Sequence, residues 1–520
     1  MTIKSISRHS RRDFLRASLA GATFLPFARA RAASRVWPSY PFTLGVASGY
    51  PTADGAVLWT RLAPQPLTPN GGIEEAVIPV QWEVAADEGF KTIVARGVAY
   101  AQADWAHSVH VEVNGLQAWR WYHYRFHCGD ATSVTGRLRT APRHDQIIDG
   151  LRFAVASCQH YETGYYAAYR HMLADQLDLV LHVGDYIYES AAHTVPVRHH
   201  AGREPFTLSD YRMHHAQYRS DRDLQAAHAA CPWLMVWDDH DVENDYAGAY
   251  SENNDDPSWF LRRRANAYRA YYEHMPLPRA MLPFGPDMCI YTGVDYGPLL
   301  RFTLLDGRQY RSRQPCPPPG RGGSTTIENC TARLAEQQTF LGARQEQWFA
   351  QQMNASHAHW NVVGQTTLMA QADSKRGAGE AFFSDGWDGY PAARRRLLTA
   401  TADSAARNPV FLGGDVHSFW VTDLKADYAR AASPVVATEF VTTAISSNPI
   451  PEALAAAIRD ENPHIRYGRT GPRGYLRMAC GPRYLQADLR GLDDVTQLDT
   501  ACRSLASFVV EDGRPGAQAV

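Results

Sequence analysis

Side chains that can bind metal ions follow four short apolar runs in this sequence. The four ends are Cys158, Asp185, the acidic segment 238–245 and the pair Asp415 and His417. Thiolate, carboxylate and imidazole groups are the usual protein ligands of metal ions. A single Asp at a strand end more often forms a turn or caps a helix. Four such ends at one edge of a sheet would instead bring their ligands together.

Carboxylates grouped in this way favour a site with two metal ions. A bridging carboxylate can hold two cations about 3.5 to 4 Å apart, so that one activates a water molecule and both hold a phosphoryl oxygen. Asp185 and Tyr188 lie three residues apart just beyond an apolar run, so both can face one centre if the chain turns into a helix. Taken alone, Tyr188 is more consistent with an aromatic packing residue.

The elements that carry these ends indicate an α/β fold. Between residues 151 and 185 an apolar run, a segment of helical spacing and a second apolar run follow one another. Strand, helix and strand form a βαβ unit, whose parallel strands are usually covered on both faces. Ligands bind at the carboxyl edge of such a sheet. Residues 41–142, in contrast, alternate in short runs that predict a β-sandwich of immunoglobulin or fibronectin type III kind.

The first 32 residues have the layout of an export signal. Arg11 and Arg12 precede Phe-Leu, a mildly apolar stretch and small residues at A-x-A spacing. Paired arginines in this context are typical of a twin-arginine signal, and the alternative is solvated charge. The apolar stretch is too short to span a bilayer, and no later segment is a candidate. We therefore expect a periplasmic or secreted protein without a transmembrane segment, with the twin-arginine export machinery as a partner.

The amino-acid composition gives no indication of a nucleic-acid partner. The 520 residues carry 52 Lys and Arg against 54 Asp and Glu, so nothing indicates specific binding to nucleic acid. The eight cysteines are widely spaced and contain no C-x-x-C pair. Cys316 and Cys330 flank a Pro- and Gly-rich loop, so an oxidising compartment could join them. The oligomeric state stays open.

Five segments resemble the PhoD-like alkaline phosphatases, within the calcineurin-like or purple acid phosphatase-like metallophosphoesterases. They read VGDYIYE, WDDHDVENDYAG, LDGRQYRS, VVGQ and GGDVHS. The resemblance covers nearly the whole chain after the signal. It implies an α/β fold, a four-layer αββα sandwich, with an N-terminal all-β domain. The expected boundaries are 1–32 for the signal, 38–143 for the β-sandwich and 150–510 for the catalytic domain.

The resemblance also implies an iron site. Asp185 takes the bridging position and Tyr188 the phenolate position, and Cys158 stands where the superfamily has a first Asp. His417 keeps the terminal histidine of a G-H-x-H motif. Thiolate and phenolate are anionic donors that stabilise trivalent iron, so we expect Fe³⁺ here.

A calcium site is expected beside it. Asp415 stands in place of the first His of the G-H-x-H motif, which moves the second site away from zinc. The acidic segment supplies Asn244 and Asp239, and which of the two ligates is left open. Oxygen donors and water suit a hard cation such as Ca²⁺.

The candidate catalytic residues are Asp185, Asn244, His240 and Arg308. By resemblance, His240 can protonate the leaving group or bind phosphate; the alternative is that it orients Asp239. Arg308 can hold a phosphate, but pairing with Asp306 is the simpler expectation.

These residues predict an exported phosphatase and phosphodiesterase acting at alkaline pH, in which a metal-bound hydroxide attacks phosphorus. The substrates would be small or polymeric phosphate esters. One alternative is a phospholipase D-like or teichoic acid phosphodiesterase with the same site. Another is a noncatalytic surface protein that keeps the fold.

Overall fold

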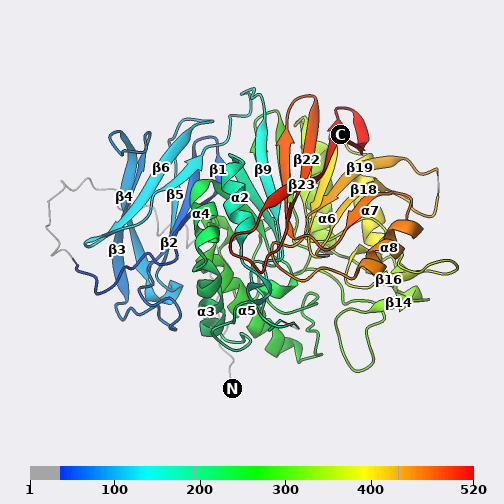
Figure 1. Ribbon diagram of the computed structural model, residues 1–520, viewed down its shortest axis with the longest axis horizontal. Coiled ribbons are helices and arrows are strands. Elements are labelled where there is room, and N and C mark those ends of the chain that lie inside the picture. The colour runs from blue at the N-terminus through cyan, green and yellow to red at the C-terminus, as the bar shows by residue number, and fades with distance from the viewer. Residues whose placement is uncertain (1–34, 193, 431) are drawn as a thin grey trace, which may run out of the picture.

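The computed structural model describes residues 35–192, 194–430 and 432–520, and the predicted signal lies outside these residues. The described chain is a mixed α/β structure with two large sheets (Figure 1). The N-terminal strands lie at one end of the molecule, and the C-terminal strands continue the first large sheet beside β9 (Leu151–Ala156) (Figure 1). No helix in the described ranges has the length and apolar character needed to cross a membrane.

The first large sheet has ten strands in the described residues, in the order β24-β23-β22-β21-β9-β10-β11-β1-β2-β5. Its centre is parallel and consists of β9 (Leu151–Ala156), β10 (Leu179–Val183) and β11 (Pro232–Val236). Antiparallel strands continue one side of it: β21 (Gly474–Cys480), β22 (Tyr484–Leu492), β23 (Cys502–Glu511) and β24 (Arg514–Ala519). The predicted βαβ unit is therefore present, with α2 (Ala167–Ala174) as its helix.

The second large sheet has seven strands in the described residues, in the order β12-β13-β15-β17-β19-β18-β20. They are β12 (Thr292–Tyr296), β13 (Leu300–Leu304), β15 (Trp360–Gly364), β17 (Pro409–Gly413), β18 (Phe419–Lys425), β19 (Val435–Val441) and β20 (Ile465–Arg469). Neighbours from β13 to β19 are parallel.

Successive side chains of the second sheet enter two different hydrophobic cores, one on each face of the sheet. In β17, Val410 and Leu412 join the core between the sheets, whereas Phe411 joins the core beneath the outer helices. Successive side chains of a strand point to opposite faces, so this division makes the second sheet buried on both sides. Phe153 of β9 meets Phe302 of β13 edge to face at 5.2 Å, which places the two sheets face to face.

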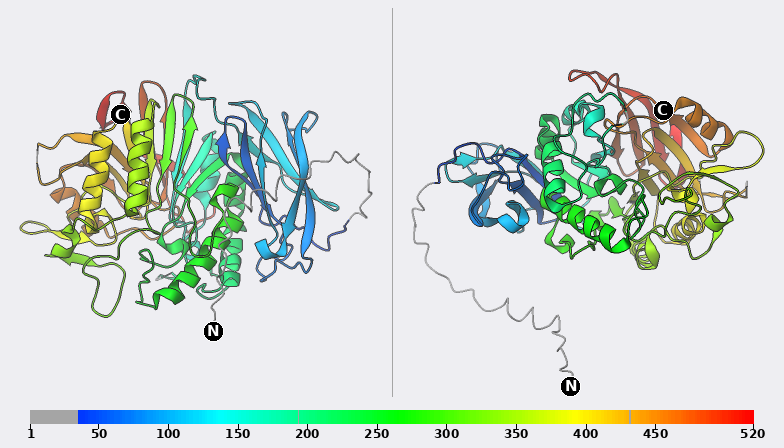
Figure 2. Two further views of the ribbon diagram at one scale, coloured as in Figure 1. Left: turned by 180° about the vertical axis from the view of Figure 1, so that it is seen from behind. Right: turned by 90° about the horizontal axis from the view of Figure 1, so that it is seen from below.

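Helices cover the outer faces. The first sheet packs with α2, α3 (Leu208–Arg219), α4 (Arg222–Ala230) and α5 (Pro257–His274), and the second with α6 (Gly342–Ala355), α7 (Pro391–Ala402) and α8 (Glu452–Glu461). Figure 2 shows α6 and α7 side by side over the second sheet. The expected fold class, an α/β sandwich with an all-β N-terminal part, is confirmed.

The N-terminal region is joined to the catalytic region through a shared sheet. Strands β1 (Val46–Thr52), β2 (Gly55–Arg61) and β5 (Ser108–Val113) extend the ten-stranded sheet, because β1 pairs in parallel with β11. The opposite layer consists of β3 (Val77–Ala85), β4 (Ile93–Gln102), β6 (Trp121–Cys128), β7 (Ala131–Thr132) and β8 (Gly136–Arg139). Backbone hydrogen bonds between β1 and β11 therefore join the two regions that the sequence separates near residues 143–150.

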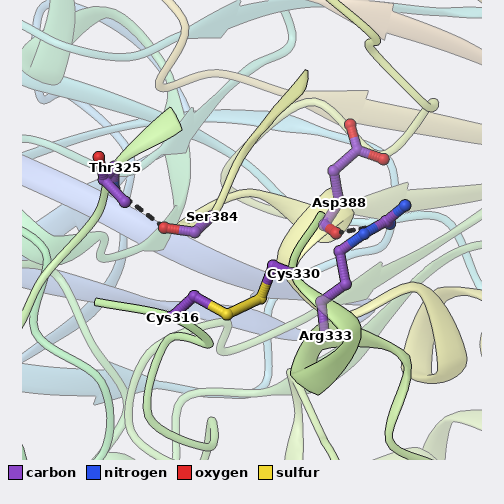
Figure 3. Close-up of a disulfide and its surroundings, with 6 residues drawn as sticks. All are labelled: Cys316, Thr325, Cys330, Arg333, Ser384 and Asp388. Atoms are coloured by element: carbon purple, nitrogen blue, oxygen red, sulfur yellow. Dashed lines mark hydrogen bonds between the residues drawn. A yellow bond between two sulfur atoms is a disulfide. The ribbon is translucent and has the colours of Figure 1, made fainter. Parts of the chain in front are cut away.

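A disulfide joins Cys316 and Cys330, as the sequence allowed (Figure 3). Between them lies β14 (Thr326–Glu328), which pairs only with β16 (Ala381–Phe383) in the described structure.

Candidate metal centre

Four ligand-bearing residues adopt a backbone conformation that non-glycine residues rarely have. The φ angles of Cys158, Asp185, Asp415 and His417 are 59°, 56°, 62° and 50°. They follow β9, β10 and β17 at the carboxyl edges of parallel strands. Such conformations cost of order 1 to 3 kcal/mol each and are found mainly where function requires them. The predicted convergence is present, and each turn carries strain. The expectation that all the ends belong to one sheet is wrong, because β9 and β10 lie in the ten-stranded sheet whereas β17 lies in the seven-stranded sheet.

Glycines allow the chain to approach this edge closely. A Cβ atom on Gly184, whose φ is +112°, would lie 2.6 Å from the Cβ atom of Asp238. A Cβ atom on Gly414 would lie 2.5 Å from the hydroxyl of Ser157. A side chain at either position would push apart the turns that carry the acidic residues.

Within the described residues, the first group of candidate ligands is Cys158, Asp185 and His417, whose ligand atoms lie within 4.8 Å of one another. Tyr188 lies beside them: its hydroxyl donates to Asp185 Oδ2 at 2.9 Å and lies 3.0 Å from His417 Nε2. His417 Nδ1 lies 2.6 Å from the carbonyl oxygen of Asn448. A donated Nδ1–H leaves the Nε2 lone pair free for a metal ion.

The second group consists of Asp185, Asp238, Asp239 and Asp415. Asp185 belongs to both groups, as a bridging carboxylate must. Buried oxygens of Asp185 (Oδ1) and Asp238 (Oδ2) have no hydrogen-bond partner in the part of the chain that the structure describes, whereas Asp239 Oδ1 forms an ion pair with Arg308 at 3.2 Å. Because an unpaired buried carboxylate oxygen is costly, a bound cation fits this group.

The pKa shifts of these side chains also favour a bound cation. Burial, and then the charge of Asp239, raises the pKa of Asp185 well above its usual range. Burial, and then Asp238, does the same for Asp415. The pKa values of the Cys158 thiol and the Tyr188 phenol are also raised, first by burial and then by Asp185. Without a cation the deprotonated ligand set is strongly disfavoured, and a cation reverses that balance.

A third group, Asp239, Asp245 and Asp385, adjoins the second. Burial, then Asp385 and Asp239, raises the pKa of Asp245 to about 7. Sequence reasoning missed Asp238, Asp245 and Asp385. Asp238 and Asp245 belong to the acidic segment, and the density of carboxylates there could have identified them as candidate ligands. Asp385 follows β16, which belongs to neither large sheet, and its place in the sequence carried no signal.

Asp241 fixes the turns that present the carboxylates. Its side chain accepts hydrogen bonds from the backbone N–H groups of Asp185, Tyr186 and Asp238 at 2.9 to 3.1 Å. These bonds tie the end of β10 to the end of β11. Burial raises the pKa of Asp241 to about 7.

His240 stands at the edge of the first group. Its ring stacks on Tyr188 with centroids 4.1 Å apart, and its Nδ1 lies 2.8 Å from Glu189 Oε2. Burial opposes protonation, but Glu189, Asp239 and Asp185 outweigh it and raise the pKa of His240 well above its usual range. His240 hydrogen-bonds to Glu189 rather than to Asp239, so the alternative role of orienting Asp239 has no hydrogen bond to support it.

Comparison with known proteins identifies the family. Residues 153–489 match the family described as PhoD-like phosphatase, and residues 28–142 match its N-terminal domain. The chain belongs to the PhoD-like phosphatase family. It is accordingly a phosphoric ester hydrolase, and not the noncatalytic surface protein considered above.

Two relatives of this PhoD-like phosphatase cover most of its length. Alkaline phosphatase D of Bacillus subtilis (strain 168) is 44% identical over 490 residues, which are 93% of this chain and 83% of the relative. A solved structure described as the structure of PhoD is 43% identical and superposes with a TM-score of 0.88, over 94% of this chain and 93% of that one.

Arg308 of this PhoD-like phosphatase does not pair with Asp306 through its side chain, so that expectation is wrong. The guanidinium is fully buried and forms ion pairs with Asp238, Asp239 and Asp385. Asp306 instead accepts backbone N–H groups of the turn, including that of Arg308 at 3.0 Å. The crowded carboxylates attract the cation more strongly than a turn-bound Asp does. A contact between Arg308 and phosphate stays a prediction.

Asn244 lies next to the acidic groups. Its side-chain N–H donates to Glu252 Oε2 at 3.0 Å, and its backbone N–H donates to Glu189 Oε1 at 2.9 Å. Asp239 belongs to two of the three groups. Asn244 as a metal ligand or catalytic residue of the PhoD-like phosphatase stays a prediction.

Proposed function

We propose that this PhoD-like phosphatase is an exported alkaline phosphatase and phosphodiesterase with one iron (Fe³⁺) and one calcium ion. The position of Asp185 carries this proposal, because its carboxylate belongs both to the group with Cys158 and His417 and to the all-carboxylate group. Thiolate and phenolate donors favour trivalent iron, whereas carboxylate oxygens favour calcium. The name of the Bacillus subtilis relative, alkaline phosphatase D, supports action at alkaline pH.

When bound, two such ions supply an activated water and neutralise charge on the phosphoryl oxygens. The chain supplies orientation and a proton. Thr367 Oγ1 donates to Asp415 Oδ2 at 2.7 Å, which holds that carboxylate toward the group. Glu189 holds His240 by its Nδ1, so the ring can give the proton that a leaving alkoxide needs. Direct attack by water requires no Ser or Thr nucleophile and forms no covalent phosphoenzyme.

Metal analysis with a visible spectrum tests the centre. We expect iron and calcium in the protein purified from its native compartment, and a tyrosinate-to-iron absorption band that disappears in Tyr188→Phe. We expect Asp185→Ala to lose activity and both ions together. Full activity in Asp185→Ala would falsify the bridging role.

Substrate assays separate phosphatase from the polymer- and lipid-directed alternatives. The proposal predicts turnover of p-nitrophenyl phosphate and of bis-p-nitrophenyl phosphate. Preference for phosphatidylcholine or teichoic acid over both would favour the phospholipase D-like or cell-wall alternative.

Export is tested with the full chain. Replacing Arg11 and Arg12 by Lys should retain the precursor in the cytoplasm, because the twin-arginine machinery reads that pair. Unchanged delivery to the periplasm or medium by the variant would contradict this route.

A further inference from the structure

The loop closed by the disulfide has little hydrophobic core of its own. We define the clamp loop as residues 314–330, which contain Cys316, Cys330 and β14. Its buried apolar contacts are limited to a cluster of Ile327, Cys330 and Phe382. Its remaining attachments are polar, and the disulfide joins its two ends (Figure 3). Such a loop keeps its shape only while its few attachments hold.

The clamp loop lies directly on the acidic segment of the metal centre. The backbone N–H of Gly322 donates to the carbonyl oxygen of Glu252 at 2.8 Å. A Cβ atom on Gly322 would lie 2.4 Å from the carbonyl oxygen of Ser251, and one on Gly323, at φ +69°, would lie 3.3 Å from the Cβ atom of Asp245. Arg321 adds an ion pair to Glu252. The two glycines therefore permit a backbone contact that other residues would prevent.

Two side chains of the clamp loop hold carboxylates of the third group. Ser324 donates both its backbone N–H, at 3.0 Å, and its hydroxyl to Asp245 Oδ2. Gln314 Nε2 donates to the carbonyl oxygen of Asp245 at 2.6 Å and to Asp385 Oδ1 at 2.8 Å. Asp245 in turn donates its backbone N–H to Asp239 Oδ2 at 2.7 Å, so the support reaches a carboxylate that the second and third groups share.

Asp385 depends on the clamp loop through β16 as well. The backbone N–H of Thr325 donates to the Ser384 hydroxyl at 2.9 Å (Figure 3). The Ser384 N–H donates to the Thr325 carbonyl oxygen at 3.0 Å. Asp385 is the next residue. In the described chain β16 pairs with β14 and with no other strand, so the clamp loop holds the backbone before Asp385, while Arg308 and Arg311 hold its carboxylate.

We propose that the clamp loop is a positioning element for the carboxylate side of the metal centre, and that the Cys316–Cys330 disulfide sets the affinity of that side for calcium. This inference rests on the proposed iron–calcium function. Gln314 and Ser324 are positioning residues, since they act through Asp245 and Asp385. Among the described residues, no hydrogen bond or ion pair joins the clamp loop to the side chain of Cys158, Tyr188 or His417, so iron binding should be unaffected.

Calcium binding to the full-length mature protein tests the proposal. The double variant Cys316→Ser/Cys330→Ser should bind calcium about 10- to 100-fold more weakly than wild type, the usual effect of losing a partner that orients a metal ligand. The iron absorption band should not change. Phosphatase activity should fall at limiting calcium and return when calcium is saturating. The iron band separates the two explanations, because a general loss of structure would weaken iron binding as well as calcium binding.

Matched variants separate the loop from general damage. Cys289→Ser/Cys502→Ser removes two free thiols outside the clamp loop and should leave calcium affinity unchanged. Ser324→Ala and Gln314→Leu keep the disulfide and should weaken calcium binding, whereas Ser324→Thr, which keeps a hydroxyl, should bind more tightly than Ser324→Ala. These two single variants decide the question if the double variant does not fold.

Two results would overturn the inference in distinguishable ways. If wild type and all clamp-loop variants bind calcium equally, the positioning role is wrong while the proposed function stands. If wild type binds iron but no calcium at any concentration tested, the iron–calcium function is itself wrong, and the inference falls with it.

Discussion

Glu189 Oε2 and His240 Nδ1 lie 2.8 Å apart, and the same carboxylate uses its other oxygen to accept the backbone N–H of Asn244 at 2.9 Å. The ion pair keeps the pKa of Glu189 at about 2 despite its burial, because His240 is charged beside it. The carboxylate thus fixes both the orientation and the charge of the imidazole. Because Nδ1 is engaged by Glu189, the Nε2–H is the imidazole proton that remains for a leaving group.

Glu189→Gln should separate substrates by their leaving groups. The amide cannot stabilise an imidazolium, so His240 would give up its proton more easily to bulk water and hold it less often for catalysis. We expect kcat to fall roughly 100-fold for an alkyl phosphate, and much less for p-nitrophenyl phosphate, whose leaving group needs no proton. Steady-state kinetics on the two substrates measures this. Equal losses on both would contradict a proton-donating His240.

Arg308→Gln should destabilise the protein strongly. The guanidinium is buried among Asp238, Asp239 and Asp385, and removing one partner of a buried ionic network typically costs about 3 to 5 kcal/mol. Arg395, which pairs with Glu336 on the surface, is the matched control. Its replacement by Gln should cost less than about 1 kcal/mol. Urea unfolding of both variants gives the comparison, and similar losses would show that the network is not a stabilising one.

His182→Leu should reduce the sensitivity of the protein to acid. Burial lowers the pKa of His182 to about 3, and neither ring nitrogen has a partner in the described structure. The unfolded state therefore takes up a proton below about pH 6.5, whereas the folded state does so only near the folded pKa. Stability is lost as pH falls through that window, by up to about 1.4 kcal/mol per pH unit.

The measurement is the free energy of unfolding against pH for wild type, His182→Leu and the surface variant His144→Leu. His182→Leu should show a shallower decline by about one proton, while the control keeps the wild-type slope. Parallel curves for all three would exclude His182 as a source of acid sensitivity.

Chelation should destabilise the protein more at high pH. The folded-state pKa values of Asp185 and Asp415 are raised, so the metal-free folded protein holds protons that the unfolded chain releases. Stability of the metal-free form therefore falls as pH rises above the unfolded value. We expect the difference in Tm between calcium-loaded and chelated protein to grow from about pH 6 to about pH 9. Calorimetry at the two pH values checks this, and a constant difference would speak against metal binding at these carboxylates.

The site residues that directly follow strands could be predicted from the sequence. Cys158 and Asp185 follow neighbouring parallel strands, which bring such ends to one edge, so their convergence could be predicted. Asp415 follows a strand of the facing sheet, and the packing of two sheets against each other has no local signature in the sequence. Asp385 could not be found in this way, because a two-stranded sheet and a disulfide bring it to the centre. The partners of Arg308 were misjudged for a related reason: local spacing favoured Asp306, while burial among three distant carboxylates decides the structure.

In the fold, too, local features could be predicted from the sequence and long-range pairings could not. Alternation and βαβ spacing are local signals, and the strands that they indicate are found in the two large sheets and in the five-stranded sheet of the N-terminal region. The pairing of β1 with β11 joins residues far apart in the sequence and has no local signature. Pairing between distant strands is set by which edges remain free after the rest of the sheet has formed, and composition does not report it.

That β1 pairing has a practical consequence for anyone who shortens this chain. A fragment starting at residue 150 would contain every candidate ligand, yet the outer edge of β11 would lose the partner that Ser48 and Gly49 provide. Trp59, whose indole N–H donates to the carbonyl oxygen of Glu273 in α5, would be missing as well. An open, apolar edge strand is a template for intermolecular pairing. The N-terminal strands therefore protect this edge from intermolecular pairing, and we expect a fragment without them to aggregate.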